Sequence, residues 1–360
     1  MMTDGKVPAI SLLVPIYNVE KYLRQCLDSA MRQTLKDIEV ICINDGSTDS
    51  SREIIQEYLD KDSRFRVIDK ENSGYGSSMN KGLEAAKGEY VAILESDDFF
   101  EPDALEKLYL AAKEADADVV KADFNLYWSE PEERIERFGW VHPEEAGAST
   151  PLASIQVFYR KPSIWSAIYK RVFLEQNSIS FLETPGASYQ DAGFNFKVWV
   201  SAQSIVLLDE VVLNYRQDNE ASSVNAPGKV YCVCDEYREM VRFLKTRPNE
   251  EIIVPVLVKM RYDSYMWNYD RLTEPLQKEF VLRMSEDFRH EDEQGLTDYT
   301  LFESWKQQDR QLIISDPMQF HAQRLVEEST GKIDTAKRLY RVGGIGMLKQ
   351  ALVNKVRNKG

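Results

Sequence analysis

The fold of this chain can be inferred outward from the segment Val91-Ala92-Ile93-Leu94-Glu95-Ser96-Asp97-Asp98-Phe99-Phe100. Four apolar residues, the pattern of a buried strand, run directly into a cluster of three carboxylates. Like charges at a strand end repel each other, so folding alone does not favour them. A divalent cation explains the cluster, because hard cations bind oxygen ligands, and a metal at the carboxyl end of a strand in an α/β sheet usually holds a phosphate. The alternative is a helix N-terminus at Pro102, where acidic residues are favoured.

Strands and helices alternate through the first 125 residues. Apolar runs predict strands over 10–14, 38–43, 65–68, 90–94 and 118–122, and helical spacing predicts helices over 19–31, 50–59, 75–86 and 102–114. Such alternation predicts an α/β fold with a mainly parallel sheet and helices on both faces. Residues 129–150 are rich in Pro, Glu and Gly and are expected to form a loop. Beyond residue 230 the pattern is mostly helical.

Composition limits the class of protein. The 360 residues are 43% hydrophobic and 29% charged, as expected for a globular protein with a full core and room for two domains. No apolar run approaches the roughly 20 residues that span a membrane, and the N-terminus has no signal-peptide pattern. The net charge of −14 argues against nucleic-acid binding. We therefore expect a cytoplasmic protein.

The charge is unevenly distributed along the chain. Residues 332–360, the basic tail, contain eight basic residues and one acidic residue, a net charge of +7. A basic amphipathic segment can bind an anionic membrane, which would hold the protein at the inner face of the cell membrane. The alternative is a helix that packs on the body of the protein with its basic face in water.

Two further polar turns follow predicted strands. They are Pro15-Ile16-Tyr17-Asn18-Val19-Glu20 and Asn44-Asp45-Gly46-Ser47-Thr48-Asp49. Because the carboxyl ends of parallel strands share one edge of a sheet, these turns and residues 95–98 are expected to converge on one crevice. There Tyr17 is suited to stack on a base, and Asp45 to accept hydrogen bonds from a base N–H or a ribose hydroxyl. Taken alone, residues 45–49 also suit a turn followed by a helix cap.

This combination of segments resembles the family 2 glycosyltransferases of the GT-A (Rossmann-like) fold. The order and spacing match through about residue 125, in Pro15–Asn18, Asn44–Asp49, Asn72-Ser73-Gly74, Asn80-Lys81-Gly82 and Glu95–Asp98. Such relatives use a nucleotide-diphosphate sugar with Mg²⁺ or Mn²⁺ and invert the anomeric centre, commonly in bacterial surface-polysaccharide synthesis. The resemblance implies that Asp97 holds the metal, that Asp98 lies on the acceptor side, and that the donor, expected to be UDP-linked, is bound by Pro15, Tyr17, Asn18, Glu20, Asp45, Asn72, Gly74, Asn80, Glu95, Ser96 and Asp97.

Two positions depart from the pattern of many relatives. Glu95 stands where they have Asp, and Met79 stands where they have Arg. Glu95 reaches one methylene further, which favours a contact with ribose or a metal-bound water over direct metal ligation. Met79 removes a cation from the vicinity of the diphosphate. Because Gly74-Tyr75-Gly76 and Met79-Asn80 accompany Glu-Ser-Asp-Asp in one variant of the family, the changes are interpreted as a subgroup feature.

The second half of the chain supplies a candidate catalytic base. An inverting transferase needs a base for the proton of the acceptor hydroxyl, and Asp191 matches the family's catalytic aspartate, with Tyr189 and Gln190 beside it on the acceptor side. Locally, Asp191 also suits a cap for a helix over 192–200. Trp165 suits either a sugar-stacking platform on the acceptor side or the core. Arg216 resembles a residue near the diphosphate, with a surface arginine as the alternative.

The sequence therefore predicts an inverting transferase acting on a glycan or lipid-linked acceptor. Residues 1–225 would form the GT-A domain, with donor binding in 1–125 and the acceptor side and base in 126–225, followed by a helical region over 226–360. A sugar-phosphate nucleotidyltransferase would need a Gly-rich loop after the first strand, which this chain lacks. A non-catalytic nucleotide-sugar binding module would be expected to have lost Asp97 or Asp191. A Rossmann dehydrogenase is disfavoured because no Gly-x-Gly-x-x-Gly follows a strand.

Overall fold

The structure, a computed structural model, describes residues 7–184, 186, 188–219 and 229–330. The chain divides into two compact units, Met1–Ala226 and Pro227–Gly360. The basic tail lies outside the described residues. None of the described helices is both long and apolar enough to cross a membrane.

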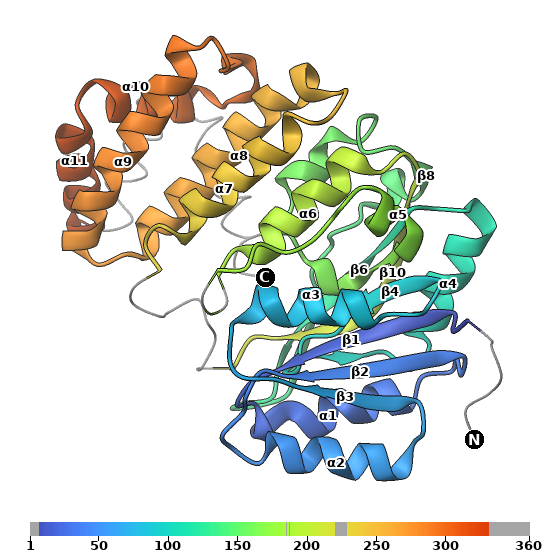
Figure 1. Cartoon of the computed structure of the whole chain (residues 1–360). Helices are drawn as coiled ribbons and strands as arrows, with labels where there is room; N and C mark the ends of the chain where they lie inside the picture. The colour runs from blue at the N-terminus through green and yellow to red at the C-terminus, as the bar shows by residue number, and fades with distance from the viewer. Residues whose placement is uncertain (1–6, 185, 187, 220–228, 331–360) are drawn as a thin grey trace. The chain divides into compact units, whose positions relative to one another are not determined.

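Unit 1 is built on a mixed β-sheet with the strand order β3-β2-β1-β4-β9-β6-β10-β5 (Figure 1). Its first half is parallel and consists of β3 (Phe65–Asp69), β2 (Ile38–Asn44), β1 (Ile10–Ile16) and β4 (Tyr90–Ile93). Every residue of β1 and β4 is buried, as expected for strands covered on both faces. The loops that follow these four strands therefore leave from one edge of the sheet.

The second half of the sheet adds antiparallel neighbours. β9 (Ala167–Lys170) runs antiparallel to both β4 and β6 (Val119–Trp128), and β10 (Ile205–Arg216) runs parallel to β6. Two antiparallel steps restore the direction, so β6 and β10 point the same way as β1 to β4. Their carboxyl ends, and the residues that lead into β9, lie at the edge where the first four strands end. β5 (Phe99–Phe100) pairs antiparallel with β10.

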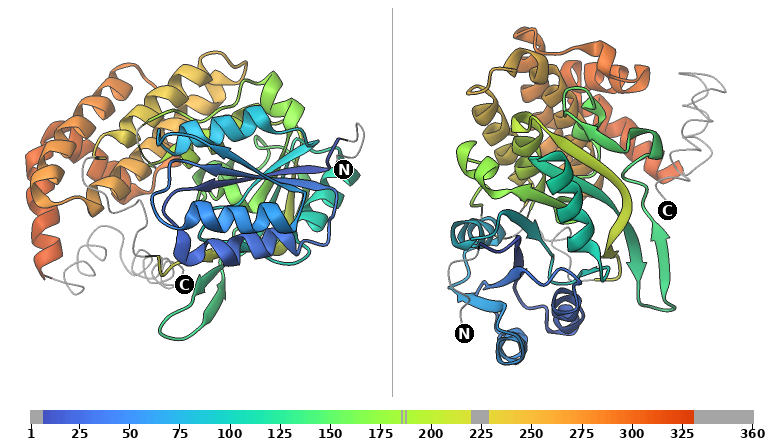
Figure 2. Two further views of the ribbon diagram at one scale, coloured as in Figure 1. Left: turned by 60° about the horizontal axis from the view of Figure 1, so that its bottom comes forward. Right: turned by 90° about the vertical axis from the view of Figure 1, so that its right-hand side faces the viewer.

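Residues 129–150 are not the simple loop expected from their composition. They contain β7 (Arg134–Arg137), which forms an antiparallel hairpin with β6, the helical turn η1 (Pro143–Glu145), and β8 (Gly147–Ser149), which pairs with β10. Figure 2 shows this hairpin extending away from the sheet. Pairing with the long strands β6 and β10 stabilises these segments although their own sequence favours turns, because strand formation depends strongly on neighbouring strands.

Helices cover both faces of the sheet, which confirms the predicted α/β architecture. α1 (Glu20–Met31) and α2 (Ser51–Lys61) cover one face of the parallel half, and α3 (Tyr75–Ala85) covers the other (Figures 1 and 2). Buried apolar residues at helical spacing, such as Leu23, Leu27 and Ala30 in α1, face the sheet. The remaining elements of unit 1 are α4 (Ala104–Ala115), η2 (Ile155–Tyr159), η3 (Ile164–Ser166), α5 (Arg171–Gln176) and α6 (Gln190–Ser201).

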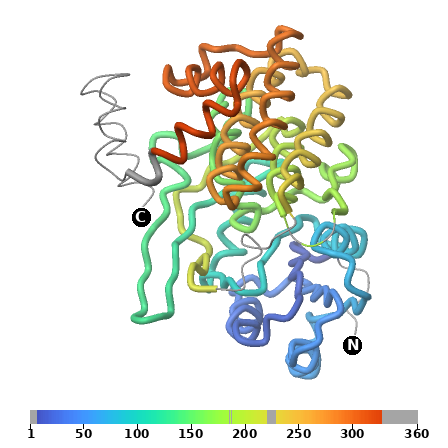
Figure 3. Tube along the Cα trace, turned by 90° about the vertical axis from the view of Figure 1, so that its left-hand side faces the viewer, coloured from blue at the N-terminus to red at the C-terminus, as the bar shows by residue number. Residues whose placement is uncertain are grey.

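Unit 2 is helical, as predicted. It consists of α7 (Cys232–Leu244), α8 (Glu250–Arg271), α9 (Glu274–Glu293), η5 (Tyr299–Leu301), α10 (Ser304–Ser315) and α11 (Pro317–Thr330), coloured from yellow to red in Figure 3. Tyr262, Tyr265 and Phe288 pack together in its core. The guanidinium group of Arg310, fully buried, pairs with Glu291 at 2.9 Å and with Asp292 at 2.5 Å. A buried arginine is tolerated here because two carboxylates neutralise it.

Candidate active site

The acidic segment 95–98 forms a turn directly after β4. The amide of Asp98 donates to the carbonyl of Glu95 at 3.0 Å, which reverses the chain before β5. Helix α4 begins only at Ala104, after β5, so the acidic residues do not occupy its first turn and the helix-terminus interpretation of the cluster is wrong. The carboxylates are instead held at the edge of the sheet where the strands end.

Asp98 is the most buried of these acids. Its Oδ1 accepts a hydrogen bond from the backbone amide of Arg216 at 2.8 Å, while its buried Oδ2 has no hydrogen-bond partner among the described residues. Burial, together with the nearby charge of Asp97, raises the pKa of Asp98 well above its usual range. The carboxyl group that joins the 95–98 turn to the end of β10 therefore favours the neutral form.

Glu95 is coupled to helix α3 through Tyr75. The Tyr75 hydroxyl donates to Oε1 of Glu95 at 2.6 Å. Burial raises the pKa of Glu95 to about 8, with further upward contributions from Asp97 and Asp191, although the Tyr75 hydrogen bond opposes them. No described residue hydrogen-bonds to the second oxygen, Oε2, so this oxygen is available for a ligand. Met79, one turn further along α3, is fully buried.

Asp45 is held by the loop between β3 and α3. Its two oxygens accept from the amides of Ser73 at 2.9 Å and Gly74 at 3.0 Å, and Lys70 forms an ion pair with it. Gly74 adopts φ 91°, and a Cβ there would lie 2.8 Å from the backbone nitrogen of Gly186. Only glycine allows this approach, so the loop that holds Asp45 packs closely against the loop before Asp191.

The loops after β1 and β2 are joined by side-chain hydrogen bonds. Oδ1 of Asn18 accepts from the amide of Thr48 at 2.8 Å, and Oε2 of Glu20 accepts from the amide of Ser50 at 2.8 Å. Both side chains, predicted to bind the donor, therefore brace one loop against the other. Tyr17 is 52% exposed and remains free to stack on a ligand, whereas Pro15 is buried within β1.

The loop before α6 is held by hydrogen bonds of the Gln190 side chain. The Gln190 side chain is buried, accepts from the amide of Ser188, and donates to Thr184 Oγ1 at 2.8 Å and to the carbonyl of Gly186 at 3.2 Å. Tyr189 takes a left-handed conformation with φ 60° immediately before the helix. These bonds tie Thr184, Gly186 and Ser188 to the first residue of α6.

Asp191 lies in the first turn of α6, and its Oδ1 accepts from the amide of Ala192 at 2.8 Å. Burial raises its pKa from 3.8 to about 6, and the Ala192 amide and the ammonium group of Lys161 partly oppose this rise. Asp191 in turn acts electrostatically on Glu95, Tyr75 and Tyr215. The fold therefore brings the candidate base and the acidic turn, distant in sequence, into one electrostatic cluster.

Aromatic side chains form a wall beside Asp191. Trp165, only 6% exposed, stacks on Tyr215 with ring centroids 4.7 Å apart and meets Phe124 edge-on at 4.5 Å. Most of the Trp165 ring is therefore used in packing. Lys161, which the sequence did not single out, extends over this wall with its Nζ 4.0 Å from the Tyr215 ring centroid. No local pattern marks Arg160-Lys161-Pro162; only the fold brings Lys161 here.

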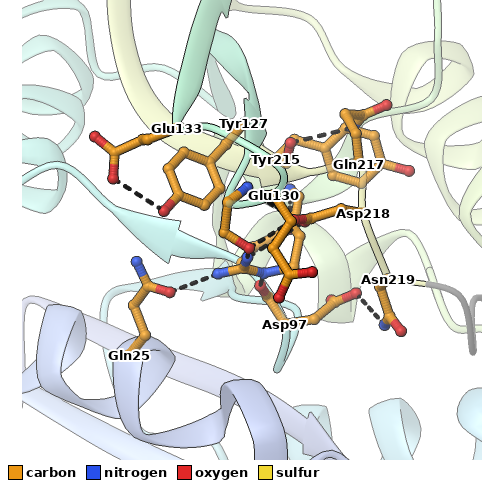
Figure 4. Close-up of polar contacts among 12 residues, drawn as sticks. Gln25, Asp97, Tyr127, Glu130, Glu133, Tyr215, Gln217, Asp218 and Asn219 are labelled. Carbon is orange, nitrogen blue, oxygen red and sulfur yellow. Dashed lines mark hydrogen bonds and ion pairs between the residues drawn. The ribbon is translucent and has the colours of Figure 1, made fainter.

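Arg216 is buried at the end of β10, so the surface-arginine interpretation is wrong. Its guanidinium group donates to the carbonyl of Asp97 at 2.9 Å and to Ser129 Oγ at 3.0 Å, and it also bonds to Gln25. Figure 4 shows Gln25 and Asp97 converging on this group from α1 and the acidic turn. The same view shows Asn219, another residue without a sequence signal, donating to Oδ2 of Asp97 at 2.8 Å.

Residues 11–162 match the family model described as Glycosyl transferase family 2. GlyG of Streptococcus pneumoniae, named a glycosyltransferase, is 32% identical over 221 residues, which cover 58% of this chain and 70% of GlyG. The chain belongs to glycosyl transferase family 2. EpsH of Bacillus subtilis is 34% identical over 213 residues, 59% of this chain, and the chain spans 61% of its length.

The fold of this family 2 chain also resembles a solved structure. Residues 1–349 of TarS from S. aureus, in complex with UDP-GlcNAc, align with a TM-score of 0.71 and 21% identity, covering 89% of this chain and 91% of that one. The likeness shows the GT-A fold expected from the sequence.

The predicted site residues of this family 2 member fall into two groups. One group carries polar atoms with no hydrogen-bond partner among the described residues, and comprises Tyr17, Glu95, Asp97 and, for Oδ2, Asp191. The other group uses its side chains to hold loops in place, and comprises Asn18, Glu20, Asp45, Asn80, Gln190 and Arg216. Asn72 and Ser96 lie on the same loops, exposed and half-buried. The first group is suited to meet substrate, and the second to position the first.

Proposed function

We propose that the chain is an inverting glycosyltransferase that moves a sugar from a UDP-linked donor to a hydroxyl of a glycan or lipid-linked acceptor in surface-polysaccharide synthesis. The observation that carries the proposal is that Tyr75 joins the two loops: its hydroxyl donates to Glu95 of the acidic turn at 2.6 Å, and its amide donates to the carbonyl of Gly186, in the loop before Asp191, at 3.0 Å. A base candidate and an acidic, donor-side turn then flank the same space. Ligands of open α/β sheets bind at this edge.

A divalent cation, Mn²⁺ or Mg²⁺, fits the acidic turn. Asp97 Oδ1 has no partner among the described residues, and a hard cation prefers such an oxygen. No group of three His, Cys, Asp or Glu side chains in the described parts of the chain could hold a metal alone. The donor would therefore complete the site, since Mg²⁺ is commonly bound by one or two carboxylates together with substrate phosphates. The bound cation would offset the charge on the leaving diphosphate.

The chain's own residues would perform the proton transfer and the positioning. Asp191, with a pKa of about 6, is mostly ionised at neutral pH and can take the proton of the acceptor hydroxyl as that oxygen attacks the sugar. Glu95 Oε2 is available to hydrogen-bond to the donor, with Tyr75 fixing the orientation of the carboxyl group. Tyr17 is suited to stack on the uracil base. Catalysis would rest on positioning and charge stabilisation.

A screen of UDP-linked sugars tests the proposal. Purified protein is incubated with each sugar nucleotide and with mono- and oligosaccharide or lipid-linked acceptors, with and without Mn²⁺, and released UDP is measured. We expect acceptor-dependent release of UDP that requires the metal and yields a product of inverted anomeric configuration. Tight binding of a UDP-sugar without turnover on any acceptor would favour the non-catalytic binding module. Release of pyrophosphate from UTP and a sugar phosphate would favour the nucleotidyltransferase.

A peripheral membrane contact is a second candidate, favoured by the charge of the basic tail. Eight basic residues within 332–360 could each contribute about 1 kcal/mol of attraction to an anionic surface. This would suit a lipid-linked acceptor at the inner face of the membrane. We expect the full-length protein, but not a variant ending at residue 331, to sediment with phosphatidylglycerol vesicles at low salt. Absence of sedimentation by the full-length protein would contradict this contact.

A further inference from the structure

Strand β7 has an open edge. In the described parts of the chain, β6 is the only strand that pairs with β7, and the other side of β6 is taken by β10. Figure 2 shows the hairpin of β6 and β7 extending away from the sheet. The exposed residues along β7 include a large apolar side chain, Ile135, which is 52% exposed. An open edge strand presents unpaired backbone N–H and C=O groups, to which a further strand can bond.

The hairpin is held in place at both of its ends. At the turn, a carboxylate oxygen of Asp218 accepts from the amides of Ser129 at 2.7 Å and Glu130 at 3.1 Å. At the other end, Arg137 pairs with Asp123 at 2.7 Å. The open edge is therefore pre-organised, and a strand that pairs with it would lose little conformational freedom in β7.

The backbone groups of Ile135 and Arg137 face the open edge. The amide of Phe138 donates to the carbonyl of Phe124 at 2.9 Å, one step beyond the last pair of the β6–β7 register. Hydrogen-bonded and non-hydrogen-bonded positions alternate along an antiparallel pair. Glu136 therefore also bonds to β6, whereas the N–H and C=O groups of Ile135 and Arg137 point away from it. A further strand would bond to these two residues.

The charges of β7 select one register for a second copy of the same strand. When Ile135 lies opposite Ile135 of an antiparallel second copy, the outward backbone groups of the two strands face each other. Arg134 then lies opposite Glu136 of the second copy, and Arg137 lies opposite Glu133, which directly precedes the strand. Opposite charges in such cross-strand positions stabilise the pairing of two strands.

Other registers of the same two strands are disfavoured. A shift of two residues in one direction places Glu136 opposite its own copy, and a shift in the other direction does the same for Arg134, so like charges repel. A shift of one residue sets outward backbone groups against groups that already bond to β6. Charges on an edge strand usually prevent pairing, but these charges permit the register that is centred on Ile135.

We propose that the protein forms a two-fold symmetric homodimer in which the β7 strands of two copies pair antiparallel about Ile135. Such an interface uses the same surface on both copies, so each cross-strand charge pair occurs twice. A strand of four residues buries a small area, so the association is weak and depends on protein concentration. The dimer would form whether or not the protein transfers sugar.

The experiment reverses one charge at a time in the full-length protein. Glu136→Arg sets arginine opposite Arg134 of the second copy, and Arg134→Glu sets glutamate opposite Glu136, so each variant should be monomeric by itself. When the two variants are mixed in equal amounts, every cross-strand pair between them again has opposite charges, and a heterodimer should form. Glu114→Arg, a charge reversal on the exposed last turn of α4, is the matched control.

Molar mass is measured by light scattering after size-exclusion chromatography at increasing protein concentration and low salt. We expect concentration-dependent dimers for the wild type, for Glu114→Arg and for the mixture, and monomers for each β7 variant alone. Ile135→Pro, which removes an outward N–H but no bond to β6, should also be monomeric. Circular dichroism checks that each variant is folded.

Three outcomes would overturn the dimer. The first is a wild type that remains monomeric at every concentration, which would leave the edge to a different partner or to none. The second is a wild-type dimer that persists in the folded Ile135→Pro variant, because the contact would then lie elsewhere. The third is a mixture of the two folded charge variants that remains monomeric although the wild type dimerises.

Discussion

Asn80 forms a pair of hydrogen bonds with the backbone of Phe181, 101 residues further along the chain. Its Nδ2 donates to the Phe181 carbonyl at 3.0 Å, and its Oδ1 accepts from the Phe181 amide at 2.9 Å. The same Nδ2 donates to Glu183 at 2.9 Å. The side-chain amide of Asn80, on α3, thus bonds to both backbone groups of Phe181, as a neighbouring strand would. A residue expected to bind the donor holds the loop of the candidate base.

Asn80→Ala should lower both stability and transfer. The substitution leaves the polar backbone atoms of Phe181 without partners, which costs about 1–3 kcal/mol in free energy of unfolding. It also loosens the loop before Asp191, so kcat should fall while UDP affinity changes little. Urea unfolding and calorimetric UDP titration measure the two effects. Lys81→Ala, which removes an exposed pair with Glu84, is the control on the same helix. Loss of UDP binding at unchanged stability would instead assign Asn80 to the donor site.

Asp97→Ala should abolish metal-dependent binding of UDP. Asp97 offers the donor-side carboxylate oxygen that has no partner among the described residues, so its loss removes the expected metal ligand. The fold should survive, because the side chain is half-buried and its hydrogen bond comes from the side chain of Asn219. UDP titration with and without Mn²⁺ measures the effect, and Asp103→Ala serves as a nearby control that affects only an ion pair with Lys107. Full transfer in excess EDTA would rule out the metal role.

The parts of the site that the sequence could predict are those with a local signal. A buried strand that ends in polar residues is visible in the chain, and parallel strands bring such ends to one edge whatever the details of packing. This is why the turns after β1, β2 and β4 could be assigned together. The Gly74 position is similarly marked by its backbone requirement, since φ 91° excludes other residues.

The parts that the sequence could not predict depend on long-range contacts. No pattern in the sequence around Asn80 indicates that it bonds to Phe181. Arg216 bonds to Gln25 and Ser129 only because the fold places the end of β10 beside α1 and the end of β6. Lys161 likewise comes to lie over the Tyr215 ring only because β9, which follows it in the chain, inserts antiparallel between β4 and β6. The residue type determines which groups a side chain can bind. The fold determines whether that side chain bonds to other parts of the protein or remains available for a ligand.

Asp191→Asn should reduce transfer by roughly 10²-fold or more, the usual scale for losing a general base. Asparagine keeps the shape and the bond from Ala192 but cannot take a proton. Donor affinity should be nearly unchanged, and wild-type activity should decline as the pH falls through about 6. Rate measurements over pH, with UDP titration alongside, test this. If donor binding disappears instead, Asp191 belongs to the donor pocket.

The same substitution should not destabilise the protein near neutral pH. The pKa of Asp191 is raised from 3.8 to about 6 by folding, so the unfolded state loses its proton first and stability declines as the pH rises through this window. Above this pH window, burial of the ionised Asp191 side chain lowers the free energy of unfolding, and its partial contact with solvent reduces this effect. Asp191→Asn removes that cost, so its Tm at pH 7.5 should equal or exceed that of the wild type. A clearly lower Tm would contradict the buried-charge account.

Arg216→Lys should destabilise the protein even though it keeps the positive charge. The guanidinium group serves Asp97, Ser129 and Gln25 at once, and lysine cannot reproduce this planar arrangement of donors. Breaking a buried charged network of this kind costs about 3 kcal/mol in free energy of unfolding. Metal-dependent UDP binding should weaken as well, because the Asp97 carbonyl loses its anchor. Arg134→Lys, an exposed arginine over the Trp128 ring, is the matched control. If Arg216 contacts the diphosphate instead, Arg216→Lys will leave urea unfolding unchanged and weaken binding of UDP but not of uridine.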